Sequence, residues 1–145
     1  MARTTKLKEY VLDTSVVVKW FSREEKDSEK ALLLRDQLLD GFCLITVPTL
    51  LIYELANALR YNPSFSATDV NNSLDSIFNM GIKINEVDSL IINDAIRIAV
   101  KYNVTVYDAY FMALSKIEDK PLLTADYKFF KTVKGFKNLI KLSEI

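Results

Sequence analysis

Short apolar runs alternate with longer segments of helical period along this chain. In the helical segments apolar residues recur three and four positions apart, as Ile91, Ala95 and Ile98 do. This alternation is typical of βα units and predicts an α/β domain with a mostly parallel sheet. The expected strands are 9–13, 42–47, 82–86, 121–124 and 138–142, and the expected helices are 15–21, 27–40, 49–61, 67–80, 88–102, 107–118 and 126–133.

The punctuation of the sequence fits these boundaries. Gly41 and Gly81 follow two of the helical segments, where a glycine readily adopts the left-handed conformation that ends a helix. Pro48 ends the second strand, and Asn62-Pro63 closes the helix after it. With 145 residues, 50% hydrophobic content and no repeat or linker, the chain is expected to form one domain over 1–145.

Four carboxylates lie in apolar sequence, where a charge is costly unless it has a partner. Asp13 ends the first expected strand, and Asp126 follows the fourth. Ligands of open α/β sheets bind beyond the carboxyl ends of the strands, so both acids are candidates for a site. Glu54 and Asp108 lie early in helices and are expected near the same edge. The hypothesis is that all four converge.

Each acid also has a purely structural interpretation. Asp13 and Asp126 are placed to cap helices, a role worth about 1 kcal/mol. Glu54 and Asp108 have no basic residue three or four positions away, so a structural role for them would mean a charge directed to solvent. Both interpretations stand at this point.

If the four acids converge, their chemistry favours a hard divalent cation such as Mg²⁺ or Mn²⁺, which suits phosphodiester hydrolysis. The chain has no histidine and a single cysteine, Cys43, which excludes histidine-dependent nucleophilic catalysis and argues against a zinc site. Its three glycines, Gly41, Gly81 and Gly135, are isolated, so no glycine-rich phosphate loop is present.

Charge and segment composition set the expected surroundings. Lysine plus arginine equal aspartate plus glutamate at 19 each, so nucleic-acid binding would need a local basic patch. The lone Cys43 excludes an internal disulfide and suits a reducing compartment. Residues 1–6 lead into charged sequence, not a signal peptide, and no run reaches the length of a membrane span. We expect a cytoplasmic protein that does not enter a membrane.

Four stretches carry a resemblance to a known family. They are VLDTSVVVKWF at 11–21, YELANALR at 53–60, VYDAYFMAL at 106–114 and PLLTAD at 121–126. Together they resemble the PIN-domain nucleases, and within them the VapC-type toxins of prokaryotic toxin–antitoxin pairs. The four stretches appear in the order of that family, each with its acid in place, and their spacing spans most of the chain.

The resemblance implies a five-stranded parallel sheet of order 3-2-1-4-5 with helices on both faces. It also implies a metal-dependent endoribonuclease in which Asp13, Glu54, Asp108 and Asp126 bind one or two Mg²⁺ or Mn²⁺ ions. Members of this family are usually homodimers and are inhibited by a small antitoxin, here of VapB type. Apolar surface on helices 49–61 and 67–80 is a candidate for either contact.

Other residues receive roles from their position. Ser15 and Thr124 match hydroxyl positions that flank the site in similar proteins, with local capping as the alternative. Lys19 and Arg60 match positions that are often basic in sequences similar to this one, and Lys116 is expected near the same rim. All three are candidates for holding RNA phosphates, with a solvated surface charge as the alternative.

Three competing functions are weighed. One keeps the fold without catalysis, as a catalytically silent PIN-like module that binds RNA or protein. A phosphoacceptor receiver domain would also use a Lys-Pro pair such as Lys120-Pro121, but here paired N-terminal acids are lacking. A dehalogenase-type phosphatase would need an aspartate where Ser15 stands.

Overall fold

Five parallel strands form one sheet in the computed structural model, which describes residues 7–22 and 26–145. The strand order is β3-β2-β1-β4-β5, as the resemblance implied. The point at which the strand order reverses therefore lies between the neighbouring strands β1 and β4. All four pairings are parallel. The strands are β1 (Lys8–Leu12), β2 (Cys43–Pro48), β3 (Lys83–Asn85), β4 (Leu122–Thr124) and β5 (Leu139–Lys141).

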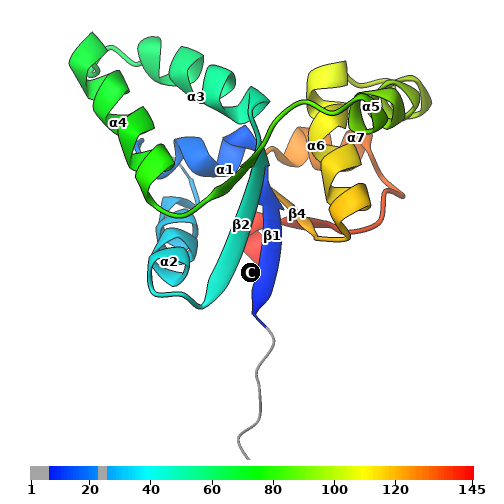
Figure 1. Cartoon of the computed structure of the whole chain (residues 1–145), viewed down its shortest axis with the longest axis horizontal. Coiled ribbons are helices and arrows are strands. Elements are labelled where there is room, and N and C mark those ends of the chain that lie inside the picture. Colours follow the sequence, from blue (N-terminus) through cyan, green and yellow to red (C-terminus); the bar gives the residue numbers. More distant parts are fainter. Residues whose placement is uncertain (1–6, 23–25) are drawn as a thin grey trace, which may run out of the picture.

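Helices cover both faces of this sheet. Figure 1 shows α1 to α4 on one side of the strands and α5 and α6 on the other. Every expected strand and helix is present in the described part of the chain, within a few residues of its expected ends. The helices are α1 (Thr14–Val18), α2 (Ser28–Leu39), α3 (Leu50–Arg60), α4 (Ala67–Asn79), α5 (Ser89–Tyr102), α6 (Val106–Glu118) and α7 (Tyr127–Thr132), with a final 3₁₀ turn η1 (Leu142–Glu144).

The first helix is shorter than expected. After Val18 the backbone turns more tightly, because Trp20 and Phe21 donate to carbonyls three residues back. The Trp20 side chain is buried, and its indole N–H donates to the carbonyl of Ala31 at 2.8 Å. Trp20 therefore anchors α2 against the core. Residues 1–6, on which the expectation of no signal peptide rests, lie outside the described residues.

The middle of α6 forms the centre of the core. Its residues from 109 to 115 are all buried, which means that the helix is covered on every side. A helix that is apolar all round must be enclosed by other elements, and α6 lies against β1, β2 and β4 as well as α5. In the described residues no helix is both long and apolar enough to cross a membrane.

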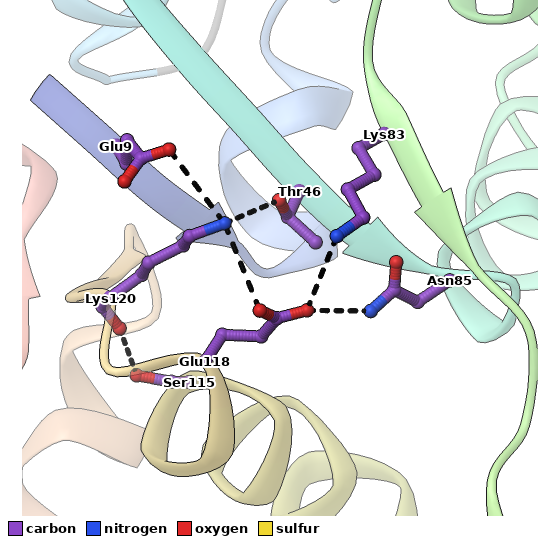
Figure 2. Close-up of polar contacts among 7 residues, drawn as sticks. All are labelled: Glu9, Thr46, Lys83, Asn85, Ser115, Glu118 and Lys120. Carbon is purple, nitrogen blue, oxygen red and sulfur yellow. Dashed lines mark hydrogen bonds and ion pairs between the residues drawn. The ribbon is translucent and has the colours of Figure 1, made fainter. Parts of the chain in front are cut away.

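A charged network fixes the C-terminal end of α6 to the sheet (Figure 2). Glu118 accepts a hydrogen bond from the side chain of Asn85 at 2.9 Å and lies 3.6 Å from the ammonium of Lys83. Lys120 lies 3.9 Å from both Glu118 and Glu9. These contacts join the end of α6 to β1 and β3.

The same network reaches the helix that carries Glu54. The carbonyl of Asn85 accepts a hydrogen bond from the backbone N–H of Thr49 at 2.9 Å, directly before α3. Asn85 is therefore linked by its side chain to α6 and by its backbone to α3. Because α3 carries Glu54 and α6 carries Asp108, this one residue helps to set the relative placement of two candidate ligands.

Replacing Glu118 by glutamine is expected to lower the free energy of unfolding at pH 7 by about 1–2 kcal/mol, because a charge-assisted hydrogen bond and two ion pairs are lost. The hydrogen bond from Asn85, followed by the charges of Lys83 and Lys120, lowers the pKa of Glu118. A lowered pKa stabilises the fold above the ordinary glutamate value of about 4.3, and this contribution disappears as the pH falls below it.

Urea denaturation at pH 7 and pH 3 measures this effect. The difference between wild type and Glu118→Gln is expected to shrink at pH 3. Glu144→Gln is the control. Glu144 is 59% exposed, so its ion pair with Lys141 at 3.8 Å is a surface pair, and its loss should change stability by less than about 0.5 kcal/mol. Equal losses in the two variants at pH 7 would contradict the role of the network.

Candidate active site

Asp13 stands directly after β1 and begins α1. Its Oδ1 accepts hydrogen bonds from the backbone N–H of Ser15 at 2.9 Å and from the Ser15 hydroxyl. The backbone of Asp13 donates to the carbonyl of Leu123 on the neighbouring strand β4 at 3.2 Å. Ser15 therefore holds the carboxylate, while the backbone of Asp13 is tied to β4, and the residue is partly buried.

Asp126 occupies the equivalent place after β4. Its Oδ1 accepts from the backbone N–H of Phe129 at 3.0 Å, which caps α7. Its own N–H donates to the hydroxyl of Thr124 at 3.0 Å. The capping roles foreseen for Asp13 and Asp126 are both present, and both capping bonds end on Oδ1 of the carboxylate.

Ser15 and Thr124 link these two acids. Their hydroxyl oxygens lie 3.4 Å apart, and the Ser15 hydroxyl accepts a hydrogen bond from the N–H of Ala125 at 2.9 Å. Ser15 thus contacts Asp13 and the residue before Asp126, while Thr124 contacts the backbone of Asp126. The two hydroxyls flank the site and cross-link the ends of β1 and β4.

Glu54 reaches the site from α3. Its Oε1 accepts a hydrogen bond from the hydroxyl of Thr14 at 2.7 Å, across forty positions of sequence. The apolar face of α3 is buried through Leu51, Leu55 and Leu59, and Glu54 lies between two of these residues in the sequence. Burial of that face and the bond from Thr14 together direct the carboxylate toward the residues after β1.

Asp108 lies in the first turn of α6. The helix is capped by Thr105, whose hydroxyl accepts from the N–H of Asp108 at 3.0 Å. A negative charge in the first turn is favoured by the helix dipole. The helix thus begins with its carboxylate at the open end, while its C-terminal end is held by the network around Glu118.

All four acids line one pocket. Its volume is about 180 Å³, enough for several water-sized ligands at about 30 Å³ each. The structure thus brings together the four acids that were expected to converge, Asp13, Glu54, Asp108 and Asp126. Asp108 and Asp126 are exposed to solvent. The remaining wall consists of Thr14, Ser15, Phe111 and Phe129.

The electrostatics of Asp13 reflect its position. Burial raises the pKa of Asp13 to about 6, and the negative charge of Asp126 adds to the rise. Hydrogen bonds from Ser15 and Thr124 oppose the rise by stabilising the charged form. Ionised Asp13 is therefore costly to the free protein and favours any cation that neutralises it.

The other acids are coupled in the same way. Burial raises the pKa of Glu54, with the charge of Asp108 adding to it and the bond from Thr14 opposing it. Burial also raises the pKa of Asp108, and the charge of Asp126 adds to that rise. Asp13, Glu54 and Asp108 thus each feel the charge of another carboxylate of the pocket.

The donor set fits a hard divalent cation. Within residues 7–22 and 26–145 none of the four carboxylates forms an ion pair with a lysine or arginine, so their shared charge is uncompensated there. In the same residues no three acidic, histidine or cysteine side chains form a ready-made metal cage. Repulsion among like charges favours carboxylates that lie apart from one another. A bound Mg²⁺ or Mn²⁺ removes this repulsion.

The three cations expected to hold RNA phosphates lie apart from this pocket. Lys19 follows α1 and is only 8% exposed. The guanidinium of Arg60 lies 4.6 Å from the centre of the Tyr61 ring. Lys116 lies 3.4 Å from Asp94. Their contact with RNA stays a prediction.

Sequence reasoning did not anticipate three residues of the pocket. Thr14 orients Glu54, and Phe111 and Phe129 supply apolar wall. Thr14 had a signal, since it directly follows Asp13 and its hydroxyl can donate. Phe111 and Phe129 had none that separates them from ordinary core residues, because an apolar side chain carries no mark of the surface it faces.

The chain belongs to the PIN domain family, whose sequence profile matches residues 10–135. This is a family of nucleases, and the residue types in the pocket suit that chemistry. The match spans β1 to the loop before β5 and includes all four acids. No curated protein sequence matches the chain.

Solved structures share the fold at low sequence identity. PAE2754 from Pyrobaculum aerophilum is 21% identical, with a TM-score of 0.66 over 94% of this chain and 91% of that one. A toxin–antitoxin complex from Klebsiella pneumoniae contains a chain that is 15% identical, with a TM-score of 0.69 over 94% and 99%. VapC20 of Mycobacterium tuberculosis, described as a sarcin-ricin loop cleaving toxin, is 12% identical, with a TM-score of 0.66 over 89% and 97%.

Asp13→Asn is expected to stabilise the free protein at pH 8 by about 2–3 kcal/mol, because each unit of pKa change corresponds to about 1.4 kcal/mol. The pKa of Asp13 is raised to about 6 in the fold, so its stabilising contribution is present at low pH and lost as the pH rises through 6. Asparagine caps a helix as well as aspartate does. The gain should therefore vanish near pH 4.

Urea denaturation in the presence of a chelator measures this gain at the two pH values. Asp75→Asn, an exposed acid of α4 outside the pocket, serves as the control and should change little at either pH. If Asp13→Asn is no more stable than wild type at pH 8, the claim that ionised Asp13 destabilises the free protein is contradicted.

Proposed function

We propose that this protein is a Mg²⁺- or Mn²⁺-dependent endoribonuclease and the toxin of a VapBC-type toxin–antitoxin pair. The observation that carries the proposal is the pocket shared by Asp13, Glu54, Asp108 and Asp126, whose carboxylates lack a paired cation in the described residues. Membership of the PIN domain family supports the nuclease chemistry. The VapC and toxin–antitoxin neighbours support the biological role.

Asp13, Glu54, Asp108 and Asp126 would hold one or two divalent ions. Such an ion, when bound, lowers the pKa of a water and stabilises charge on phosphoryl oxygens. The protein's own contribution is to keep these carboxylates ionised and in place.

Three hydroxyls and two capping bonds supply that placement. Ser15 and Thr124 fix Asp13, and Thr14 fixes Glu54. The backbone N–H of Phe129 fixes Asp126. Oxygen ligands that are oriented by a second layer of hydrogen bonds bind metal more tightly than free carboxylates do.

The cleavage test uses structured and single-stranded RNA with Mg²⁺ or Mn²⁺. Wild type is expected to cleave, and a chelator should abolish the activity. Asp13→Asn and Glu54→Gln should each lower the rate at least about 100-fold, because each removes a charged ligand. Asp75→Asn should retain full activity. Cleavage that survives chelation, or an undiminished rate in Asp13→Asn, would contradict the proposal.

The competing function is a catalytically silent module that binds RNA or protein. Calorimetric titration with Mn²⁺ separates it from the nuclease without any cleavage assay. The nuclease predicts binding to wild type that is lost in Glu54→Gln and kept in Asp75→Asn. A module whose acids serve only the fold predicts no such difference.

The proposed homodimer and VapB-type antitoxin both need exposed apolar surface. Tyr53 and Tyr107 are 74% and 63% exposed, and they line a hollow of about 320 Å³ between α3 and the starts of α5 and α6. Tyr61, directly after α3, and Phe78 on α4 are also more than half exposed. Exposed apolar patches of this kind mark contacts between proteins.

Sedimentation velocity is expected to give twice the 16.6 kDa mass of the chain. Replacing Tyr53 and Tyr107 together by serine should shift the protein to the monomer, because the apolar area that drives association is lost. Leu33→Ser on α2, an exposed apolar residue outside that hollow, is the control. A monomeric wild type, or a double variant that still dimerises, would contradict the placement of the dimer contact.

A further inference from the structure

A hollow with a basic lining lies away from the four carboxylates, none of which lines it. Its volume is about 610 Å³, and it is formed by α5, the end of α6 and the loop before β5. Figure 1 places α5, α6 and α7 together on one side of the sheet. The side chains that give the hollow its character are Arg97, Lys101, Tyr102, Lys116, Phe136 and Lys137.

Cations outnumber acids in this hollow by four to two, although the chain as a whole is neutral. Lys116 is paired with one acid, Asp94, at 3.4 Å. Arg97 and Lys137 are exposed and form no ion pair with any residue in 7–22 or 26–145. The hollow is therefore a local basic site of the kind that a neutral chain needs if it is to bind phosphates.

Aromatic side chains form part of the same wall. Tyr102 and Phe136 pack edge to face with ring centres 6.2 Å apart. The ammonium of Lys101 lies 5.3 Å from the centre of the Tyr102 ring. Aromatic rings beside cations are the usual components of a surface for single-stranded nucleic acid, because bases stack on the rings and phosphates contact the cations.

A second hollow adjoins the carboxylate pocket on the side of the loop after α5. It measures about 280 Å³ and shares Asp108, Asp126 and Phe129 with that pocket. It shares no lining residue with the basic hollow, but its lining includes Asn103, which directly follows Tyr102 of the basic hollow. Lys128 adds a cation to the second hollow. A strand that leaves the carboxylates along the second hollow therefore comes next to Tyr102 of the basic hollow.

We propose that this basic hollow holds the single-stranded RNA segment that flanks the cleaved bond. The identity of the ligand rests on the proposed ribonuclease function. The aromatic wall favours RNA over an acidic protein segment, and so does the place of Tyr102 beside Asn103 of the hollow that adjoins the carboxylates. In this proposal Arg97, Lys101 and Lys137 bind phosphates. Lys116, which the sequence already offered as an RNA-binding candidate, lines the same hollow.

The binding test uses the Asp13→Asn protein, so that cleavage is not needed. A fluorescent single-stranded RNA of about 20 nucleotides is titrated at several salt concentrations. Replacing Arg97, Lys101 and Lys137 by glutamine should weaken binding at least tenfold and reduce the salt slope by about 2, since single strands give about 0.7 per charge. The control removes three charges elsewhere, at Lys8, Lys26 and Lys30, none of which lines the hollow.

The outcomes separate the alternatives. Equal losses in the two triple variants would overturn the proposal, and so would tighter binding of an acidic peptide than of RNA that depends on the same three cations. A third variant keeps all three charges by combining Arg97→Lys, Lys101→Arg and Lys137→Arg. It should bind RNA as wild type does, which shows that the loss in the glutamine variant comes from the removed charges.

A kinetic test applies to the protein with its carboxylates intact. The glutamine variant should raise KM for the long RNA about tenfold with little change in kcat, and should leave cleavage of a tetranucleotide unaffected. Equal effects on both substrates would overturn the proposal. If wild type cleaves no RNA, the proposed function fails, while the binding test still decides whether the hollow holds a single strand.

Discussion

The pairing of β1 with β4 is the constraint on which the site depends. These strands are far apart in sequence, yet Val11 pairs with Leu122 and Leu12 with Leu123 in parallel register. Parallel pairing brings both carboxyl ends to one edge, so Asp13 and Asp126 come out side by side. The hydrogen bond from Ala125 to Ser15 closes that edge. Without this pair two of the four carboxylates would have no common pocket.

Asp13 and Asp126 combine the capping role foreseen for them with a place in the shared pocket. Asp13 and Asp126 do cap helices, and that capping is what orients them into the pocket. Burial and mutual repulsion then make the ionised cluster unfavourable, as the raised pKa of Asp13 indicates. Capping stabilises the local fold, while the cluster's charge creates the demand for a cation.

Much of this could be predicted because the signals are local. The strands, the helix ends at Gly41 and Gly81, and the four acids in apolar sequence were all readable along the chain, and the resemblance supplied the strand order. The contact of Thr14 with Glu54 could not be read, because it spans forty positions and depends on how α1 packs on α3. The basic hollow was missed for the same reason, since Arg97 and Lys137 are distant in sequence and meet only in the fold.

Crystals soaked in MnCl₂ and measured at the manganese absorption edge test the central claim most directly, because anomalous scattering locates the ion itself. One or two peaks enclosed by Asp13, Glu54, Asp108 and Asp126 are expected, and none in crystals of Asp13→Asn treated in the same way. A pocket without a peak in the wild-type crystals, or manganese bound only at other surface acids, would contradict the claim that these four carboxylates form a metal-binding active site.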